Sequence, residues 1–441
     1  MDRPQTARQS RVTVIGAGVA GVRTAVALRR RGFRGEVVLL GEETDLPYDR
    51  PPLTKQILTG TWQPARATLV QPEKLAALDI ELRPGCRATG LSPNGVRLSD
   101  GQSVEADFVV LATGSRPHHL SDEPHDPRVH TVGTLGDALR LRTALTTASS
   151  LLIVGAGLIG GEVATAARDA GLDVDVVEAG PQAFMRALGP VGGALLTARH
   201  RERGVRIHTG RWVESWHTGA DGIELELDDG SRVSADHALV AIGARPALDW
   251  LLDADDAARP LLQVNLEQGL ACDSDGRVIG TSTVYAVGDS AAWTDLGTGV
   301  RSRCQHWTRA IEQAEVVAAV IAARVDDPSP DDHAPEDQAT EFPTIGPPYV
   351  WTDQAGTRIQ VIGDPHVGGH HLTLDAVDAG TVVITADRGH VAAVTLLGTP
   401  RALAPSRAAV IDALPVAEAV ERIGAHVELA PTPVATLLAS S

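Results

Sequence analysis

Short hydrophobic runs alternate with longer amphipathic segments over most of the chain. Runs without polar interruption are typical of strands buried on both faces, and apolar positions three or four apart are typical of helices. The predicted strands cover 12–15, 37–40, 108–112, 151–154, 174–177, 239–242 and 284–287. The predicted helices cover 22–31, 163–170 and 307–323. Strands that alternate with helices indicate an α/β fold built on parallel sheets.

Three turn dipeptides interrupt this pattern and predict hairpins: Asp100-Gly101, Asp229-Gly230 and Arg388-Gly389. Beyond residue 342 the pattern changes to short strands, followed by two helical segments. The strands are predicted at 358–362, 371–374, 382–385 and 391–397, and the helices at 405–414 and 416–423. We expect a small C-terminal α+β domain there, joined through an acidic, proline-rich linker at 326–342.

A glycine turn, Gly16-x-Gly18-x-x-Gly21, lies between the first predicted strand and helix. The first glycine allows a tight turn, the second lets the backbone approach a pyrophosphate, and the third lets the helix pack closely on the strand. The helix N-terminus offers free N–H groups to the phosphates. Glu42 follows the next strand, about 20 residues after the last glycine, where an acid can bind an adenosine ribose. This order predicts a Rossmann-like dinucleotide-binding module.

The same order returns in the second half of the chain. Gly155-x-Gly157-x-x-Gly160 follows a strand, and Glu178 ends the next one. Both halves then continue through a hairpin and a strand to Gly-x-Arg-Pro, at 114–117 and 243–246. Two modules suggest two dinucleotides, FAD in the first and a nicotinamide cofactor in the second. The predicted domains are an FAD-binding domain (10–117 and 243–325), an NAD(H)-binding domain (118–242), the linker (326–342) and the C-terminal domain (343–441).

Length and charge narrow the function classes. A chain of 441 residues needs more than one core, and a net charge of −17 argues against general nucleic-acid binding. The polar start, 1–11, lacks the apolar core of a signal peptide, and the apolar helix segment 314–325 is too short to span a bilayer. We therefore expect a cytoplasmic enzyme without membrane contact.

The cysteines are few and scattered. Cys86, Cys272 and Cys304 form no C-x-x-C or C-x4-C pair, which excludes a redox disulfide between neighbouring cysteines. The histidines of the 118–130 connection match no metal-ligand spacing, so a solvated loop is favoured over a metal site. A second histidine-rich stretch, 368–371, is interpreted as a turn entering a strand. No metal site is predicted.

The loop 46–55 is stiffened by three prolines and contains Arg50 and Lys55. Only two of the 39 basic residues are lysines, Lys55 and Lys74, so a compact ammonium group at position 55 suggests a specific need. The alternative is a plain surface turn. A stiff loop beside a dinucleotide-binding strand favours the first interpretation, in which the loop aims charged side chains at a cofactor.

Three segments carry a resemblance to a known family: 47–55 (Pro-Tyr-Asp-Arg-Pro-Pro-Leu-Thr-Lys), Gly288-Asp289 and 349–354 (Tyr-Val-Trp-Thr-Asp-Gln). With the two glycine turns, the chain resembles the FAD-dependent NAD(P)H ferredoxin and rubredoxin reductases of the oxygenase-coupled type. The resemblance covers nearly the whole chain. It implies two Rossmann-like domains, for FAD and NADH, and a C-terminal α+β domain.

The resemblance also assigns candidate residues. The candidate cofactor-binding residues are Gly16, Gly18, Ala20, Gly21, Glu42, Arg50, Lys55, Ala112, Thr113, Gly114, Arg116, Gly155, Gly157, Leu158, Ile159, Gly160, Glu178, Gly243, Gly288, Asp289, His306 and Trp307. The candidate catalytic residues are Lys55, Glu162 and Trp351, with Lys55 and Glu162 as an ion pair near flavin and nicotinamide. Two alternatives stay open: a dipole-favoured acid in the first helical turn for Glu162, and a core tryptophan for Trp351.

An acid at position 178 accepts ribose hydroxyls and repels the phosphate of NADPH, so NADH is the expected donor, although Arg186 lies close in sequence. By the resemblance, Arg301 and Arg303 face an acidic iron–sulfur partner. The sequence departs from the family pattern at Gln305, Arg309 and Ala355, which leaves the identity of the partner open.

The expected function is hydride transfer from NADH to FAD, followed by single-electron transfer to a [2Fe-2S] ferredoxin that feeds a cytochrome P450 or another oxygenase. Two alternatives remain. One is an NADH-dependent flavin oxidase, although no cysteine lies between residues 1 and 83. The other is a non-catalytic NADH/FAD redox sensor that binds a protein partner.

Overall fold

The computed structural model describes residues 10–252, 262, 264–297, 299–326, 343, 345–377, 380–428 and 438–439. Contacts divide the chain into two compact units. The first unit contains Met1–Asp49, Ala67–Arg116 and Arg245–Gly346, and the second contains Arg50–Arg66, Pro117–Ala244 and Pro347–Ser441. Two of the five boundaries between the units fall within strands, β8 (Ser115–Pro117) and β17 (Ala244–Pro246). The boundaries of the three predicted domains remain a proposal.

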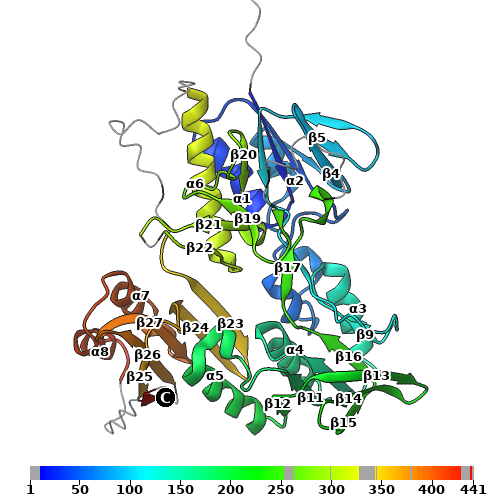
Figure 1. Cartoon of the computed structure of the whole chain (residues 1–441), viewed down its shortest axis with the longest axis vertical. Coiled ribbons are helices and arrows are strands. Elements are labelled where there is room, and N and C mark those ends of the chain that lie inside the picture. The colour runs from blue at the N-terminus through cyan, green and yellow to red at the C-terminus, as the bar shows by residue number, and fades with distance from the viewer. Residues whose placement is uncertain are drawn as a thin grey trace, which may run out of the picture. The chain divides into compact units, whose positions relative to one another are not determined.

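The first unit is built on a five-stranded parallel sheet with the order β20-β7-β1-β2-β3. Its strands are β1 (Arg11–Ile15), β2 (Glu36–Leu40), β3 (Ile80–Arg83), β7 (Phe108–Leu111) and β20 (Val284–Ala286). Helices α1 (Val19–Arg30) and α6 (Trp307–Asp326) pack against each other beside it (Figure 1). The central strand β1 is almost entirely buried, as its unbroken apolar pattern predicted.

Smaller elements complete the first unit. A three-stranded antiparallel sheet contains β4 (Ala88–Ser92), β5 (Gly95–Leu98) and β6 (Ser103–Glu105). A four-stranded sheet contains β18 (Val264–Asn265), β19 (Gly269–Cys272), β21 (Ala291–Thr294) and β22 (Arg301–Arg303). A short helix, α2, covers Pro72–Ala77. The predicted hairpin through Asp100-Gly101 is confirmed, since β5 and β6 pair antiparallel on either side of that turn.

The second unit repeats the parallel design with the strand order β12-β11-β10-β16-β9. The strands are β9 (Val129–His130), β10 (Ser150–Val154), β11 (Asp173–Glu178), β12 (Arg206–Thr209) and β16 (His237–Val240). The helices are α3 (Leu135–Leu145), α4 (Leu158–Asp169) and α5 (Met185–Glu202). An antiparallel sheet adds β13 (Val213–Gly219), β14 (Gly222–Leu227) and β15 (Arg232–Ala235).

The C-terminal part of this unit is a six-stranded antiparallel sheet with the order β23-β24-β27-β26-β25-β28 and two helices (orange to red in Figure 1). Its strands are β23 (Tyr349–Gln354), β24 (Thr357–Gly363), β25 (His370–Asp375), β26 (Thr381–Asp387), β27 (His390–Leu397) and β28 (Leu438–Ala439). The helices are α7 (Leu403–Ile411) and α8 (Val416–Gly424). This confirms the predicted α+β character, and strand β25 begins at His370, after the turn expected there.

Two helix predictions began too late. Helices α1 and α4 start at Val19 and Leu158, inside the glycine turns, because the third glycine of each motif belongs to the first helical turn. Helix α5 was not predicted. It contains Gly189, with a non-helical backbone, and Pro190, and these helix breakers hide its periodicity.

The solvated-loop interpretation was wrong for His130. This residue belongs to β9, which pairs with β16, and its Nε2 lies 3.2 Å from Nδ1 of His237. Burial lowers the pKa of His130 to about 4, and His237 contributes to the shift. All of the predicted linker after Asp326 lies outside the described residues. Among the helices that are described, none has the length and apolarity needed to cross a bilayer.

Candidate functional site

In the first unit, the glycine turn packs as its spacing predicted. Gly16 has φ +110°, and a Cβ added there would lie 2.2 Å from the carbonyl oxygen of Ala112. A Cβ on Gly21 would lie 1.9 Å from the carbonyl oxygen of Gly16. In contrast, a Cβ on Gly18 would meet no atom within 4 Å. Gly16 and Gly21 therefore close the strand–helix turn, while Gly18 leaves open space at the N-terminus of α1, where a pyrophosphate fits.

This difference gives a testable prediction. Gly16→Ala should lower the free energy of unfolding of the apoprotein by about 3 kcal/mol, because the methyl group meets a backbone carbonyl at positive φ. Gly18→Ala, at φ −76°, should leave that free energy within about 1 kcal/mol but reduce the flavin content. Urea unfolding and flavin absorbance measure the two effects. Equal destabilisation by both substitutions would contradict this division of roles.

Glu42 follows β2, as predicted, and its side chain is about half exposed. Its carboxylate forms ion pairs with Arg116 at 2.8 Å and with Arg87 at 3.5 Å. The structure thus brings together two of the candidate cofactor-binding residues, Glu42 and Arg116. Two arginines from different segments fix the acid at the carboxyl edge of the sheet, where α/β proteins bind ligands.

Gly288 and Asp289 begin a short 3-10 turn, Gly288–Ser290, one residue after β20. The backbone N–H of Gly288 donates to Oε1 of Gln313 on α6, and Ser115 Oγ donates to Asp289 Oδ2 at 2.7 Å. Gly288 has φ +70°, and a Cβ there would lie 3.1 Å from Cβ of Ala20 on α1. The turn is therefore fixed against α1 and α6, with the Asp289 carboxylate held by a hydroxyl donor.

The candidates near the start of α6, His306 and Trp307, are both partly buried. Trp307 Nε1 donates to Asp49 Oδ1 at 2.6 Å, a contact within the first unit. Burial lowers the pKa of His306, against the opposing effect of the Asp289 carboxylate. Of the proposed partner-binding arginines on β22, Arg301 is exposed.

In the second unit, the second glycine turn repeats the geometry of the first. Gly155 has φ +101°, and its added Cβ would lie 2.5 Å from the carbonyl oxygen of Ala241. A Cβ on Gly160 would lie 2.2 Å from the carbonyl oxygen of Gly155. Gly157 has no atom within 4 Å of its added Cβ. The predicted duplication is therefore confirmed at the level of backbone packing.

Glu178 is the last residue of β11, and the backbone holds its carboxylate in place. Oε2 accepts from the N–H of Ala156 and Oε1 from the N–H of Gly180, both at 2.7 Å. Nη1 of Arg186 would lie 3.7 Å from a Cβ added to Gly243. The acid is thus oriented beside the glycine turn.

Lys55 and Glu162 form a buried ion pair within the second unit. Lys55 Nζ lies 2.7 Å from Glu162 Oε1, and the two side chains are 13% and 7% exposed. Thr54 donates to Oε2 of the same carboxylate, and Thr352 donates to Oε1 at 2.5 Å. The alternative of a first-turn acid is wrong, because α4 begins at Leu158 and has no acidic residue in its first turn. The Glu162 carboxylate thus faces one cation and two hydroxyl donors in a largely buried position.

Trp351 is half-buried on β23, one residue before Thr352, and stacks on Tyr349 with 6.0 Å between ring centroids. It is therefore not a fully enclosed core residue. Sequence reasoning missed Thr54, Thr352 and Gln354, although all three lie in the segments that carried the family resemblance. Strand alternation in 349–354 would have placed Thr352 and Gln354 on one face.

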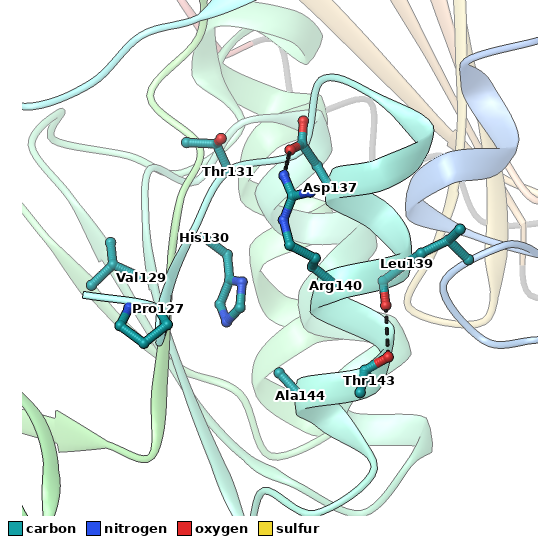
Figure 2. Close-up of a pocket in the computed structure, with 9 residues that line it drawn as sticks. All are labelled: Pro127, Val129, His130, Thr131, Asp137, Leu139, Arg140, Thr143 and Ala144. Atoms are coloured by element: carbon teal, nitrogen blue, oxygen red, sulfur yellow. Dashed lines mark hydrogen bonds and ion pairs between the residues drawn. The ribbon is translucent and has the colours of Figure 1, made fainter. Parts of the chain in front are cut away.

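A separate cavity of about 620 Å³ lies between β9 and α3 (Figure 2). His130 faces α3, where Arg140 forms an ion pair with Asp137 (Figure 2). The cavity shares no residue with the predicted cofactor-binding set. Among the described residues, no group of three or more histidine, cysteine or acidic side chains is placed to hold a metal ion.

Comparisons with known proteins agree with this architecture. The family model for pyridine nucleotide-disulphide oxidoreductases matches residues 10–314. The chain is 35% identical over 403 residues to the ferredoxin–NAD(+) reductase subunit of the benzene 1,2-dioxygenase system of Pseudomonas putida, covering 88% of this chain and 90% of that protein. It is 30% identical over 420 residues to rhodocoxin reductase of Rhodococcus erythropolis, covering 91% and 92%.

Among solved structures, the covalent putidaredoxin reductase–putidaredoxin complex matches with a TM-score of 0.83 and 27% identity, covering 95% of this chain and 99% of that chain. The sequence relatives extend beyond the region of the family model into the C-terminal sheet. The matched residues include both glycine turns and the Lys55–Glu162 pair. The chain belongs to the pyridine nucleotide-disulphide oxidoreductase family.

Proposed function

We propose that this protein is an NADH-dependent ferredoxin reductase of an oxygenase system, with FAD as its resident cofactor. The observation that carries the proposal is the pair of glycine turns with matching geometry, each open at its middle glycine, Gly18 and Gly157. A side chain at either position would project into the open space at the helix N-terminus, where a pyrophosphate would bind. The named relatives are reductase components of oxygenase systems or reductases of small electron carriers.

The chemistry that FAD supplies when bound is acceptance of a hydride and release of electrons one at a time. The chain contributes binding and orientation. Gly16, Gly18, Gly21 and Asp289 hold the flavin nucleotide, Glu178 selects NADH, and the Lys55–Glu162 pair positions the nicotinamide amide. Binding both nucleotides in a fixed orientation would lower the entropic part of the barrier to hydride transfer.

The route of the electrons follows from the cysteines. The chain contains three, Cys86, Cys272 and Cys304, and all are free. Burial raises the pKa of both Cys272 and Cys304, so these thiols stay protonated at neutral pH. These two thiols are therefore poor redox groups, and with all three cysteines free no disulfide would relay electrons between the cofactor and the external acceptor. We place this reaction in the cytoplasm, where NADH is available.

The test is NADH-driven reduction of cytochrome c with and without an added [2Fe-2S] ferredoxin. We expect ferredoxin to accelerate the reaction about tenfold or more. Without ferredoxin, cytochrome c must take electrons from the flavoprotein directly, although its surface is not complementary to that of the flavoprotein. Direct reduction of ferricyanide by NADH measures the hydride-transfer half separately. No response to ferredoxins from several sources, with rapid oxygen consumption instead, would overturn the proposal in favour of the oxidase.

A charge-reversal pair locates the docking surface. Arg301→Glu should raise the KM for ferredoxin about tenfold at low salt, and added salt should reduce the difference, because an exposed charge steers an acidic partner. Arg34→Glu is the matched control. It is also exposed, but it precedes β2 and so lies at the opposite edge of the parallel sheet from the glycine turn.

A further inference from the structure

A chain of hydrogen bonds leads from Glu162 into the interior of the second unit. Thr352 Oγ1 donates to Glu162 Oε1 at 2.5 Å, and Gln354 Nε2 donates to Thr352 Oγ1 at 2.9 Å. Gln354 Oε1 lies 2.8 Å from Nε2 of His200 on α5. Thr352, Gln354 and His200 are each 1% exposed. Since water does not reach these groups, each depends on its neighbour in the chain for hydrogen bonding.

Close packing against α4 restricts the position of the Gln354 side-chain amide. A Cβ added to Gly161 on α4 would lie 1.9 Å from Gln354 Oε1, so the glycine makes room for this side chain. The next residue, Ala355, adopts φ +50° and donates its N–H to Thr165 Oγ1 on α4 at 2.9 Å. These contacts fix the end of β23 against the helix that carries Glu162.

His200 is fixed from the other side. Its ring stacks on Phe184, with 5.1 Å between centroids and an interplanar angle of 21°. Burial lowers the pKa of His200, and the charge of Arg203 on the same helix lowers it further, against the effect of the Gln354 hydrogen bond. His200 is therefore neutral at physiological pH and carries one ring proton.

The position of that ring proton decides which group donates in every hydrogen bond between His200 and Glu162. Gln354 presents its carbonyl oxygen to His200, so His200 Nε2 must donate. The Gln354 amide then donates to Thr352, whose own proton points at the carboxylate. In the reversed chain His200 would accept, Gln354 would flip, and Thr352 could face Glu162 only as an acceptor. That arrangement requires a protonated carboxyl group.

We propose that Gln354 and His200 are positioning residues that keep the Thr352 hydroxyl donating to Glu162, so that the carboxylate paired with Lys55 stays ionised and in one orientation. This inference rests on the proposed function, because it assigns the supported carboxylate to nicotinamide binding. Preorganised donors stabilise a charge without the reorganisation that water would need. Lys55 is the cation that faces the carboxylate, and Thr54 donates to its other oxygen.

The first test reads the histidine directly. In ¹⁵N-histidine NMR of the full-length protein, the His200 resonance is assigned by its loss in His200→Gln. It should show the neutral Nε2–H tautomer throughout the neutral pH range. A neutral Nδ1–H tautomer, or a charged ring, would overturn the proposal. This measurement needs neither NADH nor ferredoxin. It therefore decides the donor–acceptor order of these hydrogen bonds even if the proposed function fails.

The second test is a matched set of substitutions, read by flavin reduction with NADH. Thr352→Val keeps the shape and removes the hydroxyl; we expect a rate about tenfold lower and an acid limb of the pH profile about one unit higher, because the carboxylate loses a donor. Thr352→Ser should rescue most of the rate. His200→Phe should show a weaker effect of the same kind, and His200→Gln, which can still donate, should be milder.

The control is Thr197→Val, which removes a buried hydroxyl from α5, the helix of His200, without touching this chain. It should change neither the rate nor the pH profile. If Thr352→Val lowers the rate no more than Thr352→Ser, with an unshifted acid limb, the hydroxyl does not support the carboxylate and the proposal is wrong. If NADH does not reduce the flavin of the wild-type protein at all, the proposed function fails. The inference is then tested only by the tautomer of His200.

Discussion

Replacing Lys55 with methionine should slow the reduction of flavin by NADH about a hundredfold and lower the free energy of unfolding by about 3 kcal/mol. Lys55 Nζ lies 2.7 Å from Glu162, and both side chains are largely buried. Removing the ammonium leaves a buried carboxylate without its counter-charge, which costs more than an exposed ion pair would. Urea unfolding and stopped-flow flavin bleaching measure the two effects on the same sample.

The double variant Lys55→Met/Glu162→Gln separates stability from catalysis. With both charges gone, Thr54 and Thr352 can still hydrogen-bond the amide, so the free energy of unfolding should return to within about 1 kcal/mol of wild type. The rate of flavin reduction should stay low, because the nicotinamide has lost both charged groups. Recovery of the rate together with stability would show that the pair is only structural.

The second large effect concerns the choice of nicotinamide cofactor. Glu178→Gln should reduce the preference for NADH over NADPH about a hundredfold, because it removes the charge that repels the phosphate and binds the ribose hydroxyls. The measurement is the ratio of kcat/KM for the two cofactors with ferricyanide as acceptor. The loss should fall mainly on the KM for NADH, with kcat nearly unchanged, since the proposed contact of Glu178 is with ribose hydroxyls and not with the reacting nicotinamide ring.

Because two backbone N–H groups donate to Glu178, a control must separate the loss of charge from the loss of these hydrogen bonds. Glutamate accepts from Ala156 and Gly180 at 2.7 Å, and glutamine can satisfy only one of these N–H groups. Glu178→Ala leaves both unsatisfied while removing the same charge. If the loss of charge sets the preference, the two variants should agree in the NADH/NADPH ratio and differ in stability. An unchanged ratio in both would place selectivity elsewhere, with Arg186 as the next residue to test.

The glycine turns and the central strands of the parallel sheets could be predicted from the sequence because their signals are local, whereas β3, β9 and β12 were not predicted. Uninterrupted apolar runs and the spacing of Gly16, Gly18 and Gly21 need no knowledge of distant segments. Helix α5 could not be predicted, since Gly189 and Pro190 interrupt its periodicity and packing overrides their low helix propensity. His130 was misplaced for a related reason, because two residues give no strand signal without their partner β16.

The candidate site was predictable only in part. The pairing of Lys55 with Glu162 came from the family resemblance, and the structure places the two in contact. The contact between His200 and Gln354 joins residues 154 positions apart, and no short-range pattern encodes it. Thr352 and Gln354 were quoted as part of a motif, but their role depends on how β23 lies against α4. Long-range hydrogen bonds of this kind follow from the fold and not from the spacing.

The support of Glu162 has a consequence for how the protein is made. Lys55 and Glu162 leave the ribosome early, together with the glycine turn that precedes each of them. Thr352 and Gln354 follow only after both dinucleotide modules have been synthesised, and β23 is held in turn by β24 and β27, which come later still. A nascent or truncated chain can therefore form its cofactor-binding turns while its central carboxylate lacks one of its donors. A chain that ended before β23 would therefore lack the Thr352 hydroxyl that donates to Glu162.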